Sequence, residues 1–348
     1  LGAECEEELV ALARALEEGR SLSGLPGAGG ASAPLVRLEF PVPLRSGLPG
    51  PSRYARLLDG SGGERLAGYA EATRGCLHRC RHCPIPAVYR GRLFAVPAEV
   101  VLEDVSRQVE AGVRHVTFGD PDFLNGPAHS LRIARALRRR HPDVTFDFTA
   151  KVGHLVRRAA EVAELASLGA LFVTSAVESP SDLVLARLDK RHRRDDVIRA
   201  FEVCARAGLA LRPTLVPFTP WSTLEDTLDL LETFEARGWI AALDPVQLSI
   251  RLLVPPGSLL LGDPGLRLEG LGEAGASWRW SHPDPRMDAL QRKVAATVED
   301  GVAAREDAQR VVERVKALAL AAAGREHTHV ARPFSAAGVP RLTESWFC

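Results

Sequence analysis

The sequence predicts an α/β protein whose central part is a partial barrel of six β/α units. Short segments rich in Val, Ile, Phe and Leu alternate with longer amphipathic segments from about residue 69 to residue 255. Strands that alternate with helices in this way form a parallel sheet covered by helices, and right-handed crossovers curl that sheet. The chain has 348 residues, 46% of them hydrophobic, which is ample for a buried core.

The residues before the barrel predict a helix, a linker and a hairpin. Glu4–Glu18 has helical periodicity and ends at Gly19. Residues 21–34 are rich in Ser, Gly, Ala and Pro and are expected to form a flexible linker. Residues 35–70 alternate apolar and polar positions around Gly60–Gly63, which predicts a hairpin. We therefore divide the chain into an N-terminal part (1–68), the barrel (69–255) and a C-terminal helical extension with a tail (256–348).

The barrel elements follow one another in a regular order. The expected strands are Tyr69–Thr73, His115–Phe118, Val144–Thr149, Leu171–Ala176, Leu209–Val216 and Val246–Leu253. The expected helices are 97–111, 128–140, 154–168, a region ending at 206, and 222–237. In barrels of this kind ligands bind at the C-terminal ends of the strands, so polar residues at those ends are the candidate site.

Composition excludes several classes of partner. Acidic and basic residues balance at 44 each, so no overall field favours nucleic acid or an anionic membrane. No apolar run approaches the ~20 residues needed to span a bilayer, and the N-terminus lacks the order of a signal peptide. Six cysteines in so long a chain argue for a reducing compartment and metal use rather than disulfides. We expect a cytoplasmic protein without a membrane partner, and a nucleic-acid partner is disfavoured.

Three cysteines form the strongest motif. Cys76, Cys80 and Cys83 have C-x3-C-x2-C spacing and supply three thiolates without a fourth. Thiolates are soft ligands suited to iron–sulfur clusters or zinc, and a four-iron cluster held by three cysteines keeps one iron open. A structural zinc site is the alternative, with His78 or His82 as the fourth ligand.

This motif resembles that of the radical S-adenosylmethionine (radical SAM) enzymes. The resemblance implies a [4Fe-4S] cluster on Cys76, Cys80 and Cys83, with S-adenosylmethionine (SAM) chelating the fourth iron. It implies one-electron cleavage of SAM to methionine and a 5′-deoxyadenosyl radical that abstracts a hydrogen atom from a substrate. It also implies an electron donor such as flavodoxin or ferredoxin, and places His82 near the adenine.

Further residues match the family's SAM-binding segments. After the second strand, Gly119, Asp120, Pro121 and Asp122 occupy the position of the turn that holds the amino group of SAM; an ordinary turn is the alternative. After the fourth strand, Ser175 and Glu178 resemble the ribose-binding segment, although Glu178-Ser-Pro could also simply begin a helix.

Two arginines lie within expected strands. Arg212 in the fifth and Arg251 in the sixth require anionic partners if they are buried. The carboxylate of SAM or of a substrate is one candidate, and a structural salt bridge is the other. Gln247, Ser249 and Arg251 alternate along the sixth expected strand, so all three are predicted to project to one face.

The tail combines aromatic residues with a terminal thiol. Arg341–Cys348 resembles the tail of a bacterial radical SAM group named for a C-terminal Cys-Sec-Ala-Glu-Pro or Cys-Cys-Ala-Glu-Pro sequence (CUAEP/CCAEP), with Ser345 where Pro is expected. This resemblance makes Cys348 a catalytic candidate that gives a hydrogen atom, ligates a metal or is modified; an incidental exposed thiol is the alternative. It also suggests a selenoprotein that continues past Cys348 through a UGA codon, which the genomic sequence would test; a deliberately shortened chain is the other explanation.

Other reactions remain open at this point. Cleavage of a different carbon–sulfur bond of SAM would give a 3-amino-3-carboxypropyl radical. A zinc-binding module without enzymatic activity is the alternative from a different functional class. RNA modification gains little from the neutral charge. The sequence does not identify the substrate.

Overall fold

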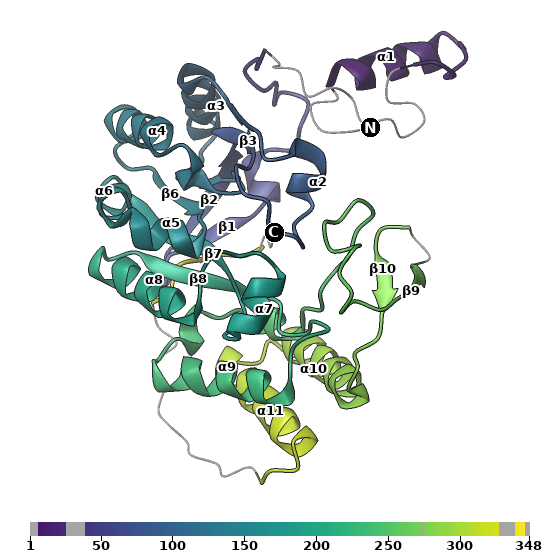
Figure 1. The fold of residues 1–348 in the computed structure, drawn as a ribbon. Coiled ribbons are helices and arrows are strands. Elements are labelled where there is room, and N and C mark those ends of the chain that lie inside the picture. Colours follow the sequence, from purple (N-terminus) through teal and green to yellow (C-terminus); the bar gives the residue numbers. More distant parts are fainter. Residues whose placement is uncertain (1–5, 26–38, 273–274, 327–337, 345–348) are drawn as a thin grey trace.

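A curled seven-stranded sheet forms the centre of the molecule, in the order β11-β1-β2-β5-β6-β7-β8 (Figure 1). The computed structural model describes residues 6–25, 39–272, 275–326 and 338–344. The strands of this sheet are β1 (Arg56–Leu58), β2 (Glu64–Ala70), β5 (His115–Phe118), β6 (Thr145–Thr149), β7 (Ala170–Glu178), β8 (Ala210–Leu215) and β11 (Arg341–Leu342). Strands β2, β5, β6, β7 and β8 are parallel, while β1 and β11 are antiparallel additions. The predicted α/β partial barrel is therefore confirmed.

Helices cover the outer face of the sheet (Figure 1). They are α3 (Ala98–Glu110), α4 (Pro127–Arg140), α5 (Val152–Arg157), α6 (Ala159–Ser167), α8 (Arg194–Arg206) and α9 (Leu224–Ala236). The short helix α7 (Asp182–Arg187) instead packs Val184 against residues of the segment after the barrel, such as Val254 and Leu260. The single helix predicted over 154–168 is wrong in one respect, because it is broken at Arg158, where the backbone leaves helical geometry between α5 and α6.

The core lies between the sheet and these helices. Alternate strand residues such as Val116, Phe118, Phe146 and Phe148 point outward and are at most 1% exposed. Phe118 stacks on Phe123 at a centroid distance of 4.7 Å and meets Phe146 edge-on at 5.6 Å. The opposite face of the same strands is polar and surrounds the interior of the half-barrel.

The sixth predicted strand is wrong. Pro245–Ser249 form a 3-10 helix, η4, because Pro245 supplies its first turn and the Asp244 side chain accepts a hydrogen bond from the backbone of Val246. A single parallel bridge between Phe218 and Arg251 is what remains of strand pairing there. The prediction that residues 247, 249 and 251 share one face through strand alternation therefore fails.

The first predicted strand, Tyr69–Thr73, is divided between two elements. Strand β2 already ends at Ala70, and Thr73–Gly75 form β3, which pairs with β4 (Leu93–Ala95) as a small antiparallel ladder. This ladder encloses the cysteine loop and α2 (Ile85–Tyr89). Gly75 has φ +79°, and a Cβ there would lie 2.4 Å from the carbonyl oxygen of Arg92, so the close approach requires glycine.

The N-terminal part joins the C-terminal segment at the sheet edge. Helix α1 (Glu6–Glu17) and the β1–β2 hairpin agree with the predicted elements. The other edge of β1 pairs with β11, with Leu57 opposite Leu342. Much of the linker predicted over 21–34 lies outside the described residues.

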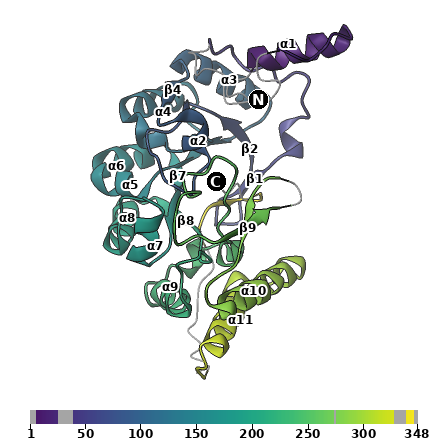
Figure 2. The ribbon, with the colours of Figure 1, turned by 45° about the vertical axis from the view of Figure 1, so that its right-hand side comes forward.

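The region after the barrel contains a small hairpin and two long helices. Strands β9 (Leu268–Leu271) and β10 (Trp278–Trp280) pair, and α10 (Pro285–Ala303) packs beside α11 (Ala308–Ala322), which also contacts α9 (Figure 2). The short 3-10 helices η1 (Pro51–Arg53), η2 (Phe123–Asn125) and η3 (Ile240–Ala242) complete the described elements. Among the described helices, none is both long and apolar enough to cross a membrane. The division into three parts stays a prediction.

Candidate functional site

The three motif cysteines lie in the loop between β3 and α2. Their thiols are free; Cys76 and Cys80 are buried and Cys83 is half-buried. Asn125 Nδ2 lies 3.3 Å from the sulfur of Cys76, and Lys151 Nζ lies 3.3 Å from that of Cys80. Hydrogen-bond donors aimed at sulfur favour its thiolate form.

Burial opposes the thiolate form unless a metal is bound. It raises the pKa of Cys76 above its ordinary value and raises that of Cys83 to about 12. Deprotonated sulfur at these positions therefore requires compensating positive charge, which a metal centre provides. The donor set fits an iron–sulfur cluster: three soft ligands in one loop, with an amide and an ammonium group directed at the sulfurs.

The loop is fixed from the C-terminal side of the chain. Arg81 Nη1 donates to Asp263 Oδ2 at 2.7 Å, and the backbone N–H of Arg81 donates to the carbonyl of Leu188 at 2.9 Å. Ser258 Oγ donates to the carbonyl of Arg81 at 3.2 Å. The segment after the barrel thus holds the cysteine loop in place, a role that sequence reasoning did not foresee.

A buried charged group lies where the ribose of SAM is expected. Glu178 Oε1 lies 2.8 Å from Lys190 Nζ and 3.1 Å from His82 Nε2. Burial alone would raise the pKa of Glu178, but the charge of Lys190 and the proximity of His82 hold it well below its usual range. Glu178 has φ +65°, a left-handed conformation that is uncommon outside glycine and concentrates at functional sites.

Sequence reasoning assigned His82 and Glu178 to the site but did not include Lys190. The side chain of Lys190 is 4% exposed. Lys190 follows apolar helix residues and precedes a run of charged residues, and this local sequence does not predict that its side chain is buried. The structure therefore adds Lys190 to the candidate site.

The turn after β5 packs closely against β2. A Cβ on Gly119 would lie 2.0 Å from the hydroxyl of Tyr69, so a larger residue there would require the Tyr69 side chain to move. Asp120 accepts hydrogen bonds from the backbone of Ala72 and the hydroxyl of Thr73, and burial raises its pKa to about 7. The Asp122 carboxylate is fully buried. Both acid side chains are therefore engaged inside the protein, and for the turn 119–122 contact with SAM stays a prediction.

Two other predicted residues make internal contacts. Ser175 is fully buried and donates to the carbonyl of Ala150 at 2.7 Å. Arg251 Nη1 pairs with Asp288 Oδ1 at 2.7 Å, and its guanidinium carbon lies 3.6 Å from the ring centroid of Trp280. For Arg251 the structure shows the salt bridge that sequence reasoning had left open.

A cavity of about 210 Å³ occupies the interior of the half-barrel. It is lined by Tyr69, Thr117, Phe118, Gly119, Asp147, Thr149, Phe172, Thr174, Arg212, Pro213, Thr214, Asp244 and Leu342. Burial lowers the pKa of Arg212, and the carboxylates of Asp244 and Asp147 act on it from a distance. Among the described residues none forms an ion pair or hydrogen bond with Arg212, so its guanidinium is available to a ligand in this cavity.

Asp147 is the principal acid that sequence reasoning missed. Its Oδ1 accepts hydrogen bonds from His115 Nε2 at 2.8 Å and Thr117 Oγ1 at 2.7 Å. The signal was present in the run Thr-Phe-Asp-Phe-Thr of β6, where polar residues at every second position predict a polar inner face.

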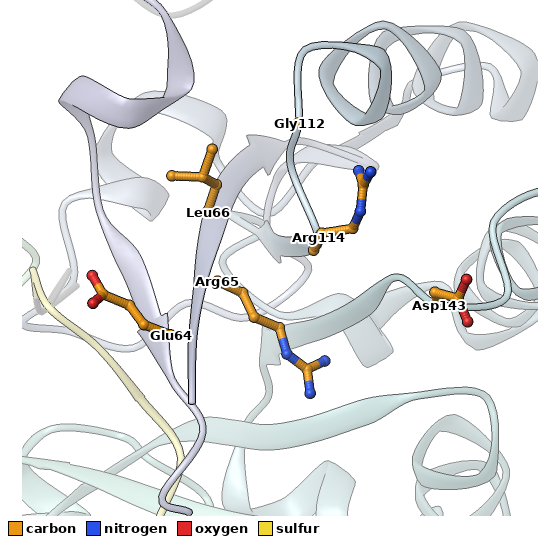
Figure 3. A pocket seen from close by; sticks show the side chains of 6 residues that line it. All are labelled: Glu64, Arg65, Leu66, Gly112, Arg114 and Asp143. Atoms are coloured by element: carbon orange, nitrogen blue, oxygen red, sulfur yellow. The ribbon is translucent and has the colours of Figure 1, made fainter. Parts of the chain in front are cut away.

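A larger hollow lies at the opposite end of the barrel. It measures about 600 Å³ (Figure 3) and is lined by Glu64, Arg65, Leu66, Gly112, Arg114 and Asp143. These residues lie at or before the beginnings of β2, β5 and β6, away from the cysteine loop. Ligands of parallel barrels bind at the C-terminal ends of the strands, so this open hollow is not the candidate site.

The tail reaches the cavity through β11. Leu342 lines the cavity wall, and Thr343 Oγ1 accepts a hydrogen bond from the backbone of Arg56 at 2.9 Å. Cys348 and the aromatic residues before it lie outside the described residues. The expectation for Cys348 therefore stays a prediction.

Comparisons with known proteins agree with this arrangement. Residues 71–231 match the Radical SAM superfamily. The ribosomal protein uS12 methylthiotransferase RimO of Paracoccus denitrificans is 30% identical over 199 residues, covering 53% of this chain and 40% of that protein. RimO of Rhodopseudomonas palustris is 28% identical over 191 residues, covering 49% and 42%. The chain spans less than half the length of these curated relatives.

Solved structures share the fold. The radical SAM methyltransferase TsrM from Kitasatospora setae superposes with a TM-score of 0.55 at 21% identity, covering 68% of this chain and 48% of that one. The cobalamin-dependent radical SAM enzyme OxsB gives 0.59 at 17% identity, covering 86% and 50%. Residues 71–231 therefore match the Radical SAM superfamily, and the solved structures share the fold of this part of the chain. The superfamily match supports an enzyme.

Proposed function

We propose that this enzyme cleaves SAM reductively at a [4Fe-4S] cluster held by Cys76, Cys80 and Cys83, giving a 5′-deoxyadenosyl radical that abstracts hydrogen from a substrate in the barrel cavity. The observation that carries the proposal is the grouping of three free cysteines in one loop, with Asn125 and Lys151 directed at two of the sulfurs. A solved TsrM structure contains a [4Fe-4S] cluster, and another contains a SAM analogue, which supports the same cofactors here.

The protein's own residues bind and orient SAM. Glu178, kept ionised by Lys190, offers carboxylate oxygens to ribose hydroxyls. His82 lies against Glu178 beside the third cysteine, where it would pack near the adenine. The buried side chain of Asp120 accepts hydrogen bonds from the backbone of Ala72 and the hydroxyl of Thr73 and so anchors the turn at 119–121, whose backbone carbonyls would accept hydrogen bonds from the amino group of SAM.

Arg212 binds an anionic group of the substrate rather than the SAM carboxylate. In the β7–β8 register, Leu215 pairs with Glu178, and Arg212 lies three residues earlier on β8. At ~3.3 Å per residue, Arg212 therefore lies about 10 Å deeper in the barrel than Glu178, the residue that contacts His82. The substrate therefore places its anion at the bottom of the cavity and its reacting carbon above it, towards the cysteine loop.

The tail belongs to the same proposal. We place the chain in the CUAEP/CCAEP-tail group, with Cys348 acting at the mouth of the barrel. Cys348 is six residues beyond Leu342, which lines the cavity, and six residues span up to about 20 Å. A genomic codon other than UGA or Cys after Cys348 would count against this assignment.

The reaction needs one electron from an external donor such as flavodoxin or ferredoxin, and we expect it to take place in the cytoplasm. The methylthiotransferase reaction of RimO is not carried over, because the chain spans less than half of those proteins.

Anaerobic reconstitution with iron and sulfide tests the proposal. Reduction with SAM should yield 5′-deoxyadenosine from the wild-type protein and from Cys204→Ala, a matched control in the α8 core, but not from the triple Cys76/Cys80/Cys83→Ala variant. A 3-amino-3-carboxypropyl product would indicate cleavage of the other bond, and zinc without sulfide would overturn the proposal. If Arg212 binds an anionic group of the substrate, fractions of a cell extract that stimulate 5′-deoxyadenosine formation should be retained by an anion exchanger. The same fractions should not stimulate the Arg212→Met variant.

A further inference from the structure

Three metal-ligating side chains from separate segments converge beside the cysteine loop. His78 lies in the loop itself, Asp122 begins η2 after β5, and His154 lies in α5. One ligand atom from each lies within 4.8 Å of the other two. The Asp122 side chain is fully buried, and those of His154 and His78 are 10% and 20% exposed. None of the three is a ligand in the proposed cluster.

The atoms that face one another lack hydrogen bonds. His154 Nδ1 lies only 2.7 Å from Asp122 Oδ2, yet the approach is not aligned for hydrogen bonding. His78 Nε2 lies 3.8 Å from the same oxygen. All three atoms are buried and without a hydrogen-bond partner among the described residues. Each such atom costs about 1–3 kcal/mol, so three in one place require an explanation.

A cation between these atoms satisfies all of them at once. Two imidazole nitrogens and one carboxylate oxygen are a common ligand set for zinc and ferrous ions. With bonds of about 2.0–2.2 Å, tetrahedral ligands lie about 3.3 Å apart, and the nitrogens of His154 and His78 lie 2.7 and 3.8 Å from Asp122 Oδ2, each within about 0.6 Å of that spacing. The geometry in the structure is thus nearly that of a formed site.

The surroundings hold the carboxylate in position. The backbone N–H of Leu124 donates to Asp122 Oδ1 at 3.0 Å, which leaves Oδ2 directed at the two histidines. Hydrogen bonds of this kind orient carboxylate ligands in metal sites. Lys151 and Arg157 are the nearby cations that act on His78, and the ammonium group of Lys151 is hydrogen-bonded to Cys80.

We propose that His78, Asp122 and His154 bind one divalent transition-metal ion of the zinc or ferrous class, separate from the iron–sulfur cluster. The ion ties the cysteine loop, through His78, to the turn after β5 and to α5. Three protein ligands leave at least one coordination position for water. The role is to fix the loop, and it does not depend on the cleavage of SAM.

Cobalt binding in the absence of the cysteines tests this site. The Cys76/Cys80/Cys83→Ala variant, stripped with chelator, should take up about one equivalent of Co²⁺. Its visible spectrum should show ligand-field bands without the intense near-ultraviolet bands of thiolate ligands. Addition of Asp122→Asn or His154→Gln should weaken this binding at least ~10²-fold, because each removes one of three ligands.

The matched control is His141→Gln in the same background. His141 Nε2 is paired with Ser106 Oγ at 2.8 Å, outside the cluster, so its replacement should leave the equivalent of Co²⁺ in place. No uptake by a variant whose circular dichroism matches wild type, or uptake unchanged by Asp122→Asn and His154→Gln, would overturn the proposal.

A second measurement avoids the triple variant in case it does not fold. Wild-type protein reconstituted with iron and sulfide, then exposed to Zn²⁺ and desalted, should contain about four iron and four sulfide with about one zinc. His154→Gln should keep the iron and sulfide content and lose the zinc. Equal zinc in both proteins would contradict the site, whereas loss of iron from wild type would bear only on the proposed function.

Discussion

Replacing Lys190 with methionine should destabilise the protein strongly, because it leaves the Glu178 carboxylate buried without its main partner. Lys190 and Glu178 lie 2.8 Å apart with side chains 4% and 5% exposed. Methionine keeps most of the volume of the lysine stem and removes only the charge. The change therefore isolates the electrostatic contribution of the pair.

The structure sets the expected size of the effect. At 2.8 Å and an effective dielectric constant of about 20, the attraction is about 6 kcal/mol, part of which only offsets the desolvation of both groups. Removing one partner of such a pair costs about 3–5 kcal/mol. We expect the lower end, about 3 kcal/mol at pH 7.5, since His82 lies 3.1 Å from the same carboxylate oxygen.

The pH dependence has a defined sign. In wild type the pKa of Glu178 is lowered, so the pair contributes stability above the unfolded value of 4.5 that is lost as pH falls through the folded pKa. Without Lys190, burial dominates and raises the pKa of Glu178 above 4.5. The folded variant then binds a proton that the unfolded chain has released, so the difference from wild type should shrink as pH falls from 7.5 towards 4.5.

Urea unfolding of the metal-free protein, followed by far-ultraviolet circular dichroism, measures these differences. The double variant Lys190→Met/Glu178→Gln removes the stranded charge and should regain about 2 kcal/mol relative to Lys190→Met alone. If Lys190→Met lowers the free energy of unfolding by less than about 1 kcal/mol, and this difference does not change with pH, the Glu178 carboxylate is solvated rather than buried.

Three further predictions follow from the contacts described above. Phe146→Ala should cost about 3–5 kcal/mol in urea unfolding, because Phe146 is fully buried between the sheet and its helices. Asp120→Asn should make the free energy of unfolding less dependent on pH. Because burial raises the pKa of Asp120 to about 7, the wild-type protein loses up to about 4 kcal/mol of this free energy between pH 4 and 7. Urea unfolding curves at both pH values would show whether the variant lacks this loss. Arg81→Met should weaken the hold of Asp263 on the cysteine loop by about 1.5–3 kcal/mol and lower the iron bound per chain after reconstitution; unchanged iron content would mean that the loop is fixed without it.

The order of strands and helices could be predicted because each element carries its own pattern. His115–Phe118 was predicted with its observed bounds, since β-branched and aromatic residues there are flanked by glycines. The sixth strand failed for a local reason: the apolar run after Asp244 looks like a strand, but Asp244 and Pro245 begin a 3-10 turn that uses the backbone groups a ladder needs. Hydrophobic pattern alone does not register that competition.

The candidate site could be predicted only where residues are adjacent in sequence. The cysteines lie within eight positions of one another, so their spacing is itself the signal. The carboxylate of Glu178 meets a lysine 12 positions later and a histidine 96 positions earlier. Pairings of that kind depend on how the strands stack in space, which no local pattern encodes.

The pairing of β11 with β1 has a consequence for the order of folding. Arg56 and Thr343, which hydrogen-bond across this pair, are 287 positions apart in the chain. Contacts of such long range close a large loop and tend to form late. The parallel strands can therefore assemble while the wall beside Leu342 is still missing, and the interior stays open to solvent until this last strand docks. A nascent or clipped chain would thus hold an assembled but unsealed cavity, in which the radical of the proposed reaction would be exposed to water and oxidants.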